Sequence, residues 1–444
     1  MKKSFVLPEI LLTVLFSGVI AFWSESSMGV ALKICLTLLF IILFFFQLLR
    51  RGDKSIENTK LRRIKRGADL MLIGGISALT VFIAMTVWIS QSNVPLWAKI
   101  TAPLAALVII GITIFIGVIK VSVSSGQLKI KDHILMLMLW WCPIVNIFLV
   151  SKYYQTARRE YIIEADRIEL DNARAENSIC KTKYPILLVH GIFFRDWQLV
   201  NYWGRVPAIL IKNGATVFYG KQQSSLAVSD SAEELRNTIL NVLKETGAEK
   251  VNIIAHSKGG LDSRYAISCL GMDKYVASLT TINTPHEGCD MVDYLLEKVP
   301  DYIKNILEKR YNAAFKRLGD TSPNFMAGVK DLSAKTRKID NQLMPDSPDV
   351  LYRSYTSVMS DAGSANFLPL NFGYRLIKKL NGPNDGLVWI ESAKHGEFIK
   401  CVSTSKKRGV SHGDVIDLMR ENIDGFDVRE FYVEMVSGLK GEGF

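Results

Sequence analysis

The chain divides near residue 150 into two parts with different hydrophobic patterns. The first 150 residues of this 444-residue chain contain five apolar stretches of 17 to 23 residues. Each is close to the length that spans the hydrocarbon core of a bilayer. They are Phe5–Trp23, Val30–Leu49, Leu70–Ile89, Trp97–Ile119 and Ile134–Val150. The pattern predicts an all-α transmembrane domain of about five spans over residues 1–150.

The first and last stretches each have a second interpretation. A removed signal peptide is disfavoured for the first, because another apolar stretch follows closely and no cleavage-site pattern separates them. The last is interrupted by Trp140, Trp141 and Pro143. A re-entrant or interfacial helix is therefore the alternative for the fifth stretch.

The remaining residues switch between strand and helix patterns. Residues 151–180 are rich in charge with apolar positions at helical spacing, which predicts a helical linker. From residue 181 to 444, strand patterns alternate with helical ones, which favours one α/β domain with a parallel sheet and crossover helices. The predicted strands are 185–189, 216–219, 251–255, 278–282 and 351–357.

Most of the positive charge belongs to the apolar part. Residues 1–150 hold 15 Lys and Arg against 6 Asp and Glu, a net of +9, while the whole chain is +11. The remainder carries only +2, so we expect no nucleic-acid partner. The segment 50–66 has eight basic and two acidic residues, which places it in the cytoplasm. Five spans then predict a multi-pass cell-membrane protein with its α/β domain on the non-cytoplasmic side, whereas four spans predict the cytoplasmic side.

The motif with the clearest chemical meaning follows the strand pattern at 251–254. Ala255-His256-Ser257-Lys258-Gly259-Gly260 reads as a strand, a tight turn with small residues on both sides of the serine, and a helix. This is the form of a nucleophile elbow, in which bulky residues beside the serine would collide. Ser257 is therefore the predicted nucleophile.

A serine nucleophile needs a base and an acid that orients the base. In a domain of this kind they follow the serine in the order acid, then histidine. Asp385, in Asn-Asp-Gly-Leu-Val at 384–388, is the candidate acid. Of the two histidines after it, His412 lies in a loop directly before a helical pattern at 415–419, which we take as the last helix. His412 is favoured as the base over His395.

The developing oxyanion needs two preorganised N–H donors. One is expected from Lys258, directly after the nucleophile. The other is expected from Ile192, in the loop that follows the strand and the pair His190-Gly191. Glycine at 191 would let the backbone approach the substrate closely.

Together these motifs resemble the bacterial triacylglycerol lipases of the Pseudomonas/Burkholderia type, within the α/β-hydrolase superfamily. The resemblance runs from about Pro185 to Leu418 and includes Thr-Pro-His-x-Gly at 284–288. It implies an α/β-hydrolase fold with Ser257, Asp385 and His412 as the catalytic triad. It also implies Ile192 and Lys258 as the oxyanion donors.

The resemblance extends to a possible structural calcium site. Asp414 lies two residues after His412, and Asp361 lies 24 residues before Asp385. The alternatives are a helix N-cap for Asp414 and an ordinary loop carboxylate for Asp361. No cofactor is expected for the chemistry itself, and the six cysteines show no metal-ligand spacing.

We therefore expect a membrane-anchored serine ester hydrolase, a lipase or carboxylesterase, that acts on acyl lipids at the bilayer. The same triad would serve an acyltransferase, a thioesterase or a phospholipase. A third possibility, from another class, is a non-catalytic membrane protein that binds a lipid or a partner. The segment Met291–Leu318 has an amphipathic helical period, which fits either a crossover helix or a lid over the active site.

Overall fold

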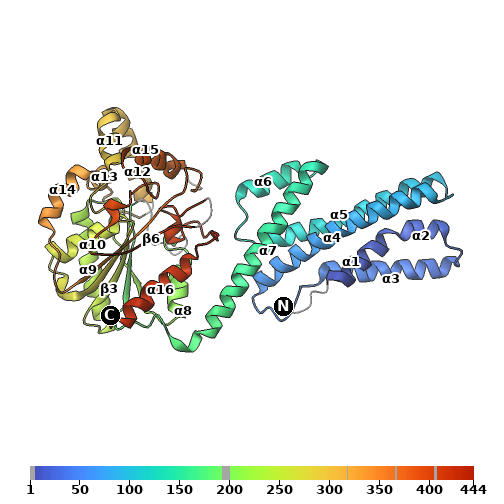
Figure 1. Cartoon of the computed structure of the whole chain (residues 1–444), viewed down its shortest axis with the longest axis horizontal. Coiled ribbons are helices and arrows are strands. Elements are labelled where there is room, and N and C mark those ends of the chain that lie inside the picture. Colours follow the sequence, from blue (N-terminus) through green and yellow to red (C-terminus); the bar gives the residue numbers. More distant parts are fainter. Residues whose placement is uncertain (1–5, 193–200, 318, 366–367, 405–407) are drawn as a thin grey trace. The chain divides into compact units, whose positions relative to one another are not determined.

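The computed structural model describes residues 6–444 except 193–200, 318, 366–367 and 405–407. The chain forms two compact units, residues 1–170 and 171–444 (Figure 1). The division falls inside the predicted linker 151–180, and α7 (Pro143–Ala173) makes most of that linker helical.

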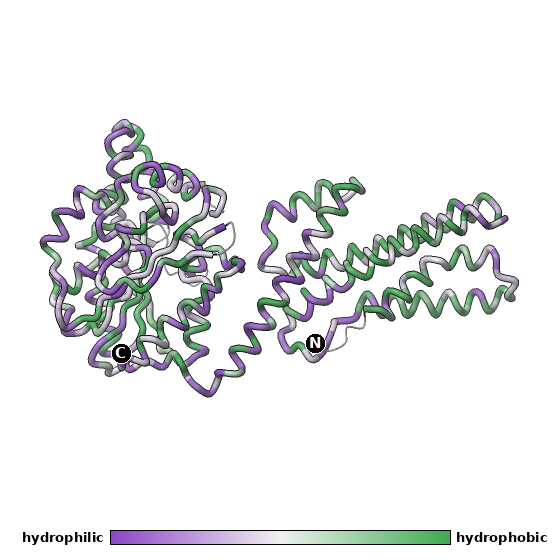
Figure 2. Tube along the Cα trace, in the orientation of Figure 1, coloured by the Kyte–Doolittle hydropathy of each residue, from purple (hydrophilic) through white to green (hydrophobic). Residues whose placement is uncertain are grey.

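The first unit is helical over its described length. Hydrophobic residues run along most of its longer helices (Figure 2). Its helices before α7 are α1 (Val6–Ser17), α2 (Val19–Glu25), α3 (Val30–Leu49), α4 (Thr59–Gln91), α5 (Leu96–Ser122) and α6 (Ile130–Leu139).

Helices α4 and α5 approach each other closely because glycine faces glycine where they cross. A Cβ atom placed on Gly67 would lie 2.8 Å from the carbonyl oxygen of Gly117, and one on Gly117 would meet Gly67 at the same distance. Small residues at such crossings are typical of helices that pack in a membrane. The pair therefore determines how tightly this part of the unit can pack.

Three helices of the described chain, α3, α4 and α5, are long and apolar enough to cross a membrane. Helices α1 and α2 make a fourth candidate if they are one span, bent by 48° at Gly18. The fifth predicted span, 134–150, is not among these candidates because the structure divides it between α6 and α7. The break comes just before Pro143, whose ring disfavours helical backbone in the preceding residue.

The second unit contains a parallel sheet with the strand order β2-β1-β3-β4-β5-β6. Five of its strands match the predicted ones to within two residues at each end. The strands are β1 (Ile186–Val189), β2 (Val217–Tyr219), β3 (Val251–His256), β4 (Val276–Ile282), β5 (Leu351–Ser357) and β6 (Glu397–Val402). The predicted α/β-hydrolase fold is confirmed.

Helices cover both faces of this sheet because strand residues alternate between the faces. Ile186 and Leu188 of β1 pack with α8 and α16, whereas Leu187 and Val189 pack with α9 and α10. The α-helices of the described second unit after α7 are α8 (Val206–Lys212), α9 (Val228–Thr246), α10 (Lys258–Cys269), α11 (Asp290–Lys298), α12 (Asp301–Arg317), α13 (Phe325–Lys330), α14 (Ala334–Leu343), α15 (Leu368–Leu380) and α16 (Val428–Gly441).

Two helix predictions are corrected. The pattern at 415–419 forms only one 3₁₀ turn, because Asp417 and Arg420 have left-handed backbone (φ 59° and 53°) and the last helix begins at Val428. The amphipathic stretch 291–318 forms two helices, α11 and α12, separated at Val299-Pro300. Proline ends the first helix since it cannot donate the next backbone hydrogen bond. Leu318 lies outside the described residues.

Candidate active site

The turn between β3 and α10 holds Ser257 in a strained conformation. Its φ is 55° and its ψ is −131°, which is rare for a residue with a Cβ. The backbone N–H of Ser257 donates to the carbonyl of Ile282, at the end of the neighbouring strand β4 (3.0 Å). The strand and the helix thus hold the serine at the carboxyl edge of the sheet, as a nucleophile elbow requires.

Glycines surround the elbow because no side chain would fit. A Cβ atom on Gly259 would lie 2.4 Å from the carbonyl oxygen of His190, and one on Gly260 would lie 2.2 Å from Oγ1 of Thr284. A Cβ atom on Gly191 would lie 2.8 Å from the Cβ of Ser257. The His190-Gly191 strand end therefore lies directly against the nucleophile.

Asp385 and His412, 27 residues apart in sequence, form a buried hydrogen-bonded pair. Nδ1 of His412 lies 2.6 Å from Oδ2 of Asp385. The other carboxylate oxygen accepts from the backbone N–H groups of Leu387 (2.8 Å) and Val388 (2.7 Å). The backbone N–H of His412 also donates to the carbonyl of Asp385 (2.9 Å). Both ends of the pair are thus held in one orientation.

The His412 ring lies near the nucleophile, since it contacts the ring of His256. The two ring centroids are 4.4 Å apart, and His256 directly precedes Ser257. No hydrogen bond joins Ser257 Oγ to His412 among the residues that the structure describes. Such bonds are often loose before substrate binds and tighten in the complex.

His395, the alternative base, lies in a different environment. Its Nε2 is 3.0 Å from Asp346, and its ring stacks on His286 at 4.4 Å between centroids. The structure therefore places His412, and not His395, against Asp385.

The two predicted oxyanion donors are Lys258, directly after Ser257, and Ile192, directly after the Gly191 that lies against Ser257. The N–H of Gly191 donates to the hydroxyl of Tyr202 (3.0 Å), so the next N–H along the strand end is that of Ile192. Lys258 is the first residue of α10, where the N–H groups have no acceptor within the helix. The loop that continues from Ile192, residues 193–200, lies outside the described residues.

The side chain of Lys258 is buried away from its backbone N–H. Its Nζ donates to Oγ of Ser231 (2.8 Å) and to Oδ1 of Asp262 (2.7 Å). Burial raises the pKa of Asp262 to about 6, even though the Lys258 ammonium acts in the opposite direction. The bond to Ser231 links α10 to α9, and the Lys258 ammonium is thus held within the core.

Tyr202 was not identified from the sequence. Its hydroxyl accepts from Gly191 and lies 2.7 Å from Nδ1 of His256. Burial lowers the pKa of His256 well below its usual range, and the nearby His412 acts in the same direction. His256 is therefore neutral, and its Nδ1 can accept a hydrogen bond from the hydroxyl of Tyr202. Tyr202 fixes the strand end that carries Ile192, and no motif in the sequence marks this role.

The acidic side chains proposed for calcium have other partners. One carboxylate oxygen of Asp414 accepts from Arg408 (2.8 Å), and the other accepts from the backbone and hydroxyl of Ser411. Asp361 accepts from the N–H of Gly363 in an exposed turn. Within the described ranges, no group of three His, Cys, Asp or Glu side chains is placed to hold a metal ion. Arg408 and Ser411 thus hold the carboxylate of Asp414, and calcium binding at Asp361 and Asp414 stays a prediction.

The parallel sheet, the elbow and the Asp-His pair define an α/β hydrolase. Residues 183–287, which include β1 to β4 and Ser257, match the model of the family Lipase (class 2). The match ends before Asp385 and His412.

The chain is also similar to triacylglycerol lipases of bacteria and yeast. A triacylglycerol lipase of Burkholderia plantarii is 38% identical over 128 residues, which cover 28% of this chain and 35% of the relative. A triacylglycerol lipase of Pseudarthrobacter phenanthrenivorans is 40% identical over 119 residues, which cover 26% of this chain and 37% of the relative. Triacylglycerol lipase 2 of Saccharomyces cerevisiae is 28% identical over 264 residues (55% and 75%). The chain thus spans little more than a third of the two bacterial relatives.

Solved structures of lipases are also similar. The Staphylococcus hyicus lipase has 18% identity and a TM-score of 0.45, covering 59% of this chain and 97% of that one. The mature Bacillus licheniformis lipase BlEst2 has 20% identity and a TM-score of 0.43, covering 57% and 92%.

Proposed function

We propose that this chain is a membrane-anchored serine hydrolase that cleaves carboxylic esters of lipids. The observation that carries the proposal is the buried Asp385–His412 pair beside the strained elbow of Ser257. His256, directly before Ser257, brings the His412 ring close to the elbow, with ring centroids 4.4 Å apart. The similarity to triacylglycerol lipases supports an acyl ester as the substrate class.

The proposed mechanism has two half-reactions. His412 takes the proton of Ser257 Oγ as the oxygen attacks the ester carbonyl, and then gives that proton to the leaving alcohol. The acyl group remains on Ser257 until a water molecule, deprotonated by the same imidazole, releases the free acid. Asp385 holds the Nδ1–H of His412 and stabilises the imidazolium. The N–H groups of Ile192 and Lys258 would bind the developing oxyanion.

The experiment that tests the proposal is covalent labelling of the purified full-length protein with a fluorophosphonate probe. We expect one adduct, mapped by peptide mass spectrometry to Ser257, and loss of ester hydrolysis in proportion to labelling. A non-catalytic binding protein would remain unlabelled.

The membrane topology follows from the number of crossings. We infer four, the bent pair α1–α2 together with α3, α4 and α5. With segment 50–66 in the cytoplasm, four crossings return the chain to the cytoplasm after α5. This orientation is opposite to the one expected from five spans. Lys120, Lys129 and Lys131, at the end of α5 and just after it, fit a cytoplasmic position.

A native thiol offers a direct test of topology. Cys269 is exposed on the second unit, so a membrane-impermeant maleimide should label it only after the cells are permeabilised. A cysteine introduced at Ser27, between α2 and α3, should be labelled in intact cells. Labelling of Cys269 in intact cells, lost in Cys269→Ser, would instead support five spans.

The active site is covered, which bears on how a substrate enters. Ser257 is 6% exposed and His412 is 7% exposed. Phe315 of α12 packs in the same apolar cluster as Ile192, whereas Ile306 and Leu307 on α12 are 48% and 41% exposed. These two adjacent side chains thus leave apolar surface of α12 in contact with solvent. We propose that α12 is a lid whose exposed apolar residues contact lipid when it opens.

The lid predicts a substrate-dependent defect. Replacing Ile306 and Leu307 with serine should lower activity on emulsified long-chain esters roughly tenfold, since apolar contact is worth about 25 cal/mol per Å². Activity on soluble short-chain esters should change little. The matched control replaces Ile211 of α8 and Leu240 of α9, which are also exposed, with serine. It should leave the ratio of the two activities unchanged. Equal losses on both substrates would contradict the lid.

A further inference from the structure

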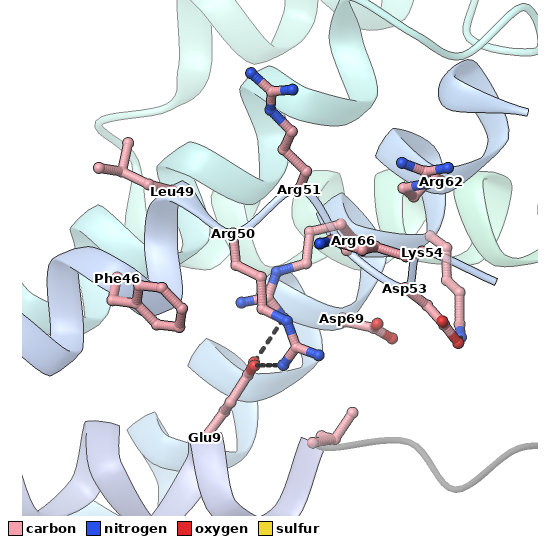
Figure 3. Close-up of a pocket in the computed structure, with 13 residues that line it drawn as sticks. Glu9, Phe46, Leu49, Arg50, Arg51, Asp53, Lys54, Arg62, Arg66 and Asp69 are labelled. Carbon is pink, nitrogen blue, oxygen red and sulfur yellow. Dashed lines mark hydrogen bonds and ion pairs between the residues drawn. The ribbon is translucent and has the colours of Figure 1, made fainter. Parts of the chain in front are cut away.

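The first unit contains a cavity of about 920 Å³ that belongs to none of the machinery described above. It lies where α3 ends and α4 begins, with the start of α1 along one side (Figure 3). This is the end of the unit that carries the basic segment 50–66.

The lining of the cavity is strongly basic. Its basic side chains are Arg50, Arg51, Lys54, Arg62, Lys65 and Arg66. Its acidic side chains are Glu9, Asp53 and Asp69. Six cations against three anions leave the cavity with a net charge of +3, so the acidic side chains cannot neutralise it.

The inner basic residues are held in place by the fold. Glu9 of α1 pairs with Arg66 (2.6 Å) and with Arg50 (3.1 Å), and these side chains converge in Figure 3. Arg66 also donates to the carbonyl of Gln47 (2.6 Å). One carboxylate thus orders two guanidinium groups that share a wall of the cavity, and positive charge remains in excess around them.

The outer basic residues are open to a ligand. Arg51 and Lys54 line the cavity and are exposed, and neither has a hydrogen bond or ion pair within the described part of the chain. An anion that enters the cavity would meet these two side chains without displacing an existing partner. Arginine suits phosphate because its planar N–H groups match two oxygens at once.

One edge of the same cavity is apolar. Phe46 and Leu49, in the last turn of α3, line it and are 71% and 74% exposed. They continue the exposed apolar surface of a helix long enough to span a membrane. The cavity therefore joins a basic surface to an apolar one at the end of a helix long enough to span a membrane.

We propose that this cavity binds the phosphate of an anionic phospholipid, with the acyl chains along Phe46 and Leu49. Basic pockets between membrane helices recognise such headgroups by charge and by arginine geometry. The site is independent of ester hydrolysis and goes beyond the proposed function. Free inorganic phosphate shares the headgroup chemistry and lacks the chains, so the two sources can be separated by experiment.

The test is native mass spectrometry of the delipidated full-length protein in detergent. Phosphatidylglycerol should bind at least about tenfold more tightly than phosphatidylcholine with the same acyl chains, because only the former carries net charge. The double variant Arg51→Gln with Lys54→Gln should weaken phosphatidylglycerol binding about 30-fold, since each basic residue is worth about fivefold.

A matched control removes the same charge elsewhere. Lys60 and Arg63 lie in the same segment, are exposed and do not line the cavity, so changing both to Gln should weaken binding by less than about threefold. Asp69→Asn should strengthen binding, a result that a misfolded variant cannot produce. Equal losses in the two double variants, or no preference for the anionic lipid, would overturn the proposal. Displacement of the lipid by equimolar inorganic phosphate would assign the site to free phosphate.

Discussion

Replacing Ser257 with alanine is expected to lower kcat on a soluble short-chain ester by roughly 10⁴-fold or more, because removing a triad nucleophile eliminates the covalent route. Folding should be preserved. The Ser257 hydroxyl makes no hydrogen bond within the described residues, and alanine at the same φ meets a similar backbone strain. The measurement is kcat together with Tm.

Ser263 provides the matched control. It is buried six residues further along the chain, within α10, and its hydroxyl donates to the carbonyl of Gly259 (2.7 Å). Ser263→Ala should lower the stability by about 1 kcal/mol and leave kcat nearly unchanged. If Ser257→Ala retains activity within tenfold of the wild type, the elbow does not carry the nucleophile.

The two histidines that follow Asp385 should differ sharply. His412→Ala removes the group that accepts the serine proton, so kcat should fall by about 10⁴-fold, as for other triad members. His395→Ala breaks the contact with Asp346 and the stack on His286, which should lower Tm and change kcat by less than about tenfold.

The His395 variant is itself the control for removing a partly buried imidazole. Both proteins would be assayed with the same soluble ester at saturating concentration. Similar mild losses in the two variants would contradict the assignment of His412 as the base, and a large loss in His395→Ala alone would reverse it.

Much of the hydrolase fold was predictable because its signals are local. Strands such as β3 are continuous apolar runs, which is typical of strands buried on both faces by helices. Strand β6 was missed because it is an edge strand, and most of its side chains are exposed, so no apolar run marks it. Pro300 is a local signal for the end of a helix, but the amphipathic period continues across it and led to the prediction of one helical stretch over 291–318.

The sequence by itself determined the elbow at Ser257, since an apolar strand, small flanking residues and a helix are all encoded within about twenty residues. It also limited the base to two histidines by their order along the chain. Only the tertiary structure shows which of them contacts Asp385, because the meeting of His412 with Asp385 depends on where β5, β6 and their loops end. Only the tertiary structure shows that the Tyr202 hydroxyl accepts from the N–H of Gly191 and that Glu9 forms ion pairs with Arg50 and Arg66. These contacts join residues that are far apart in the sequence and come together only when the chain folds, so no periodicity or short motif predicts them.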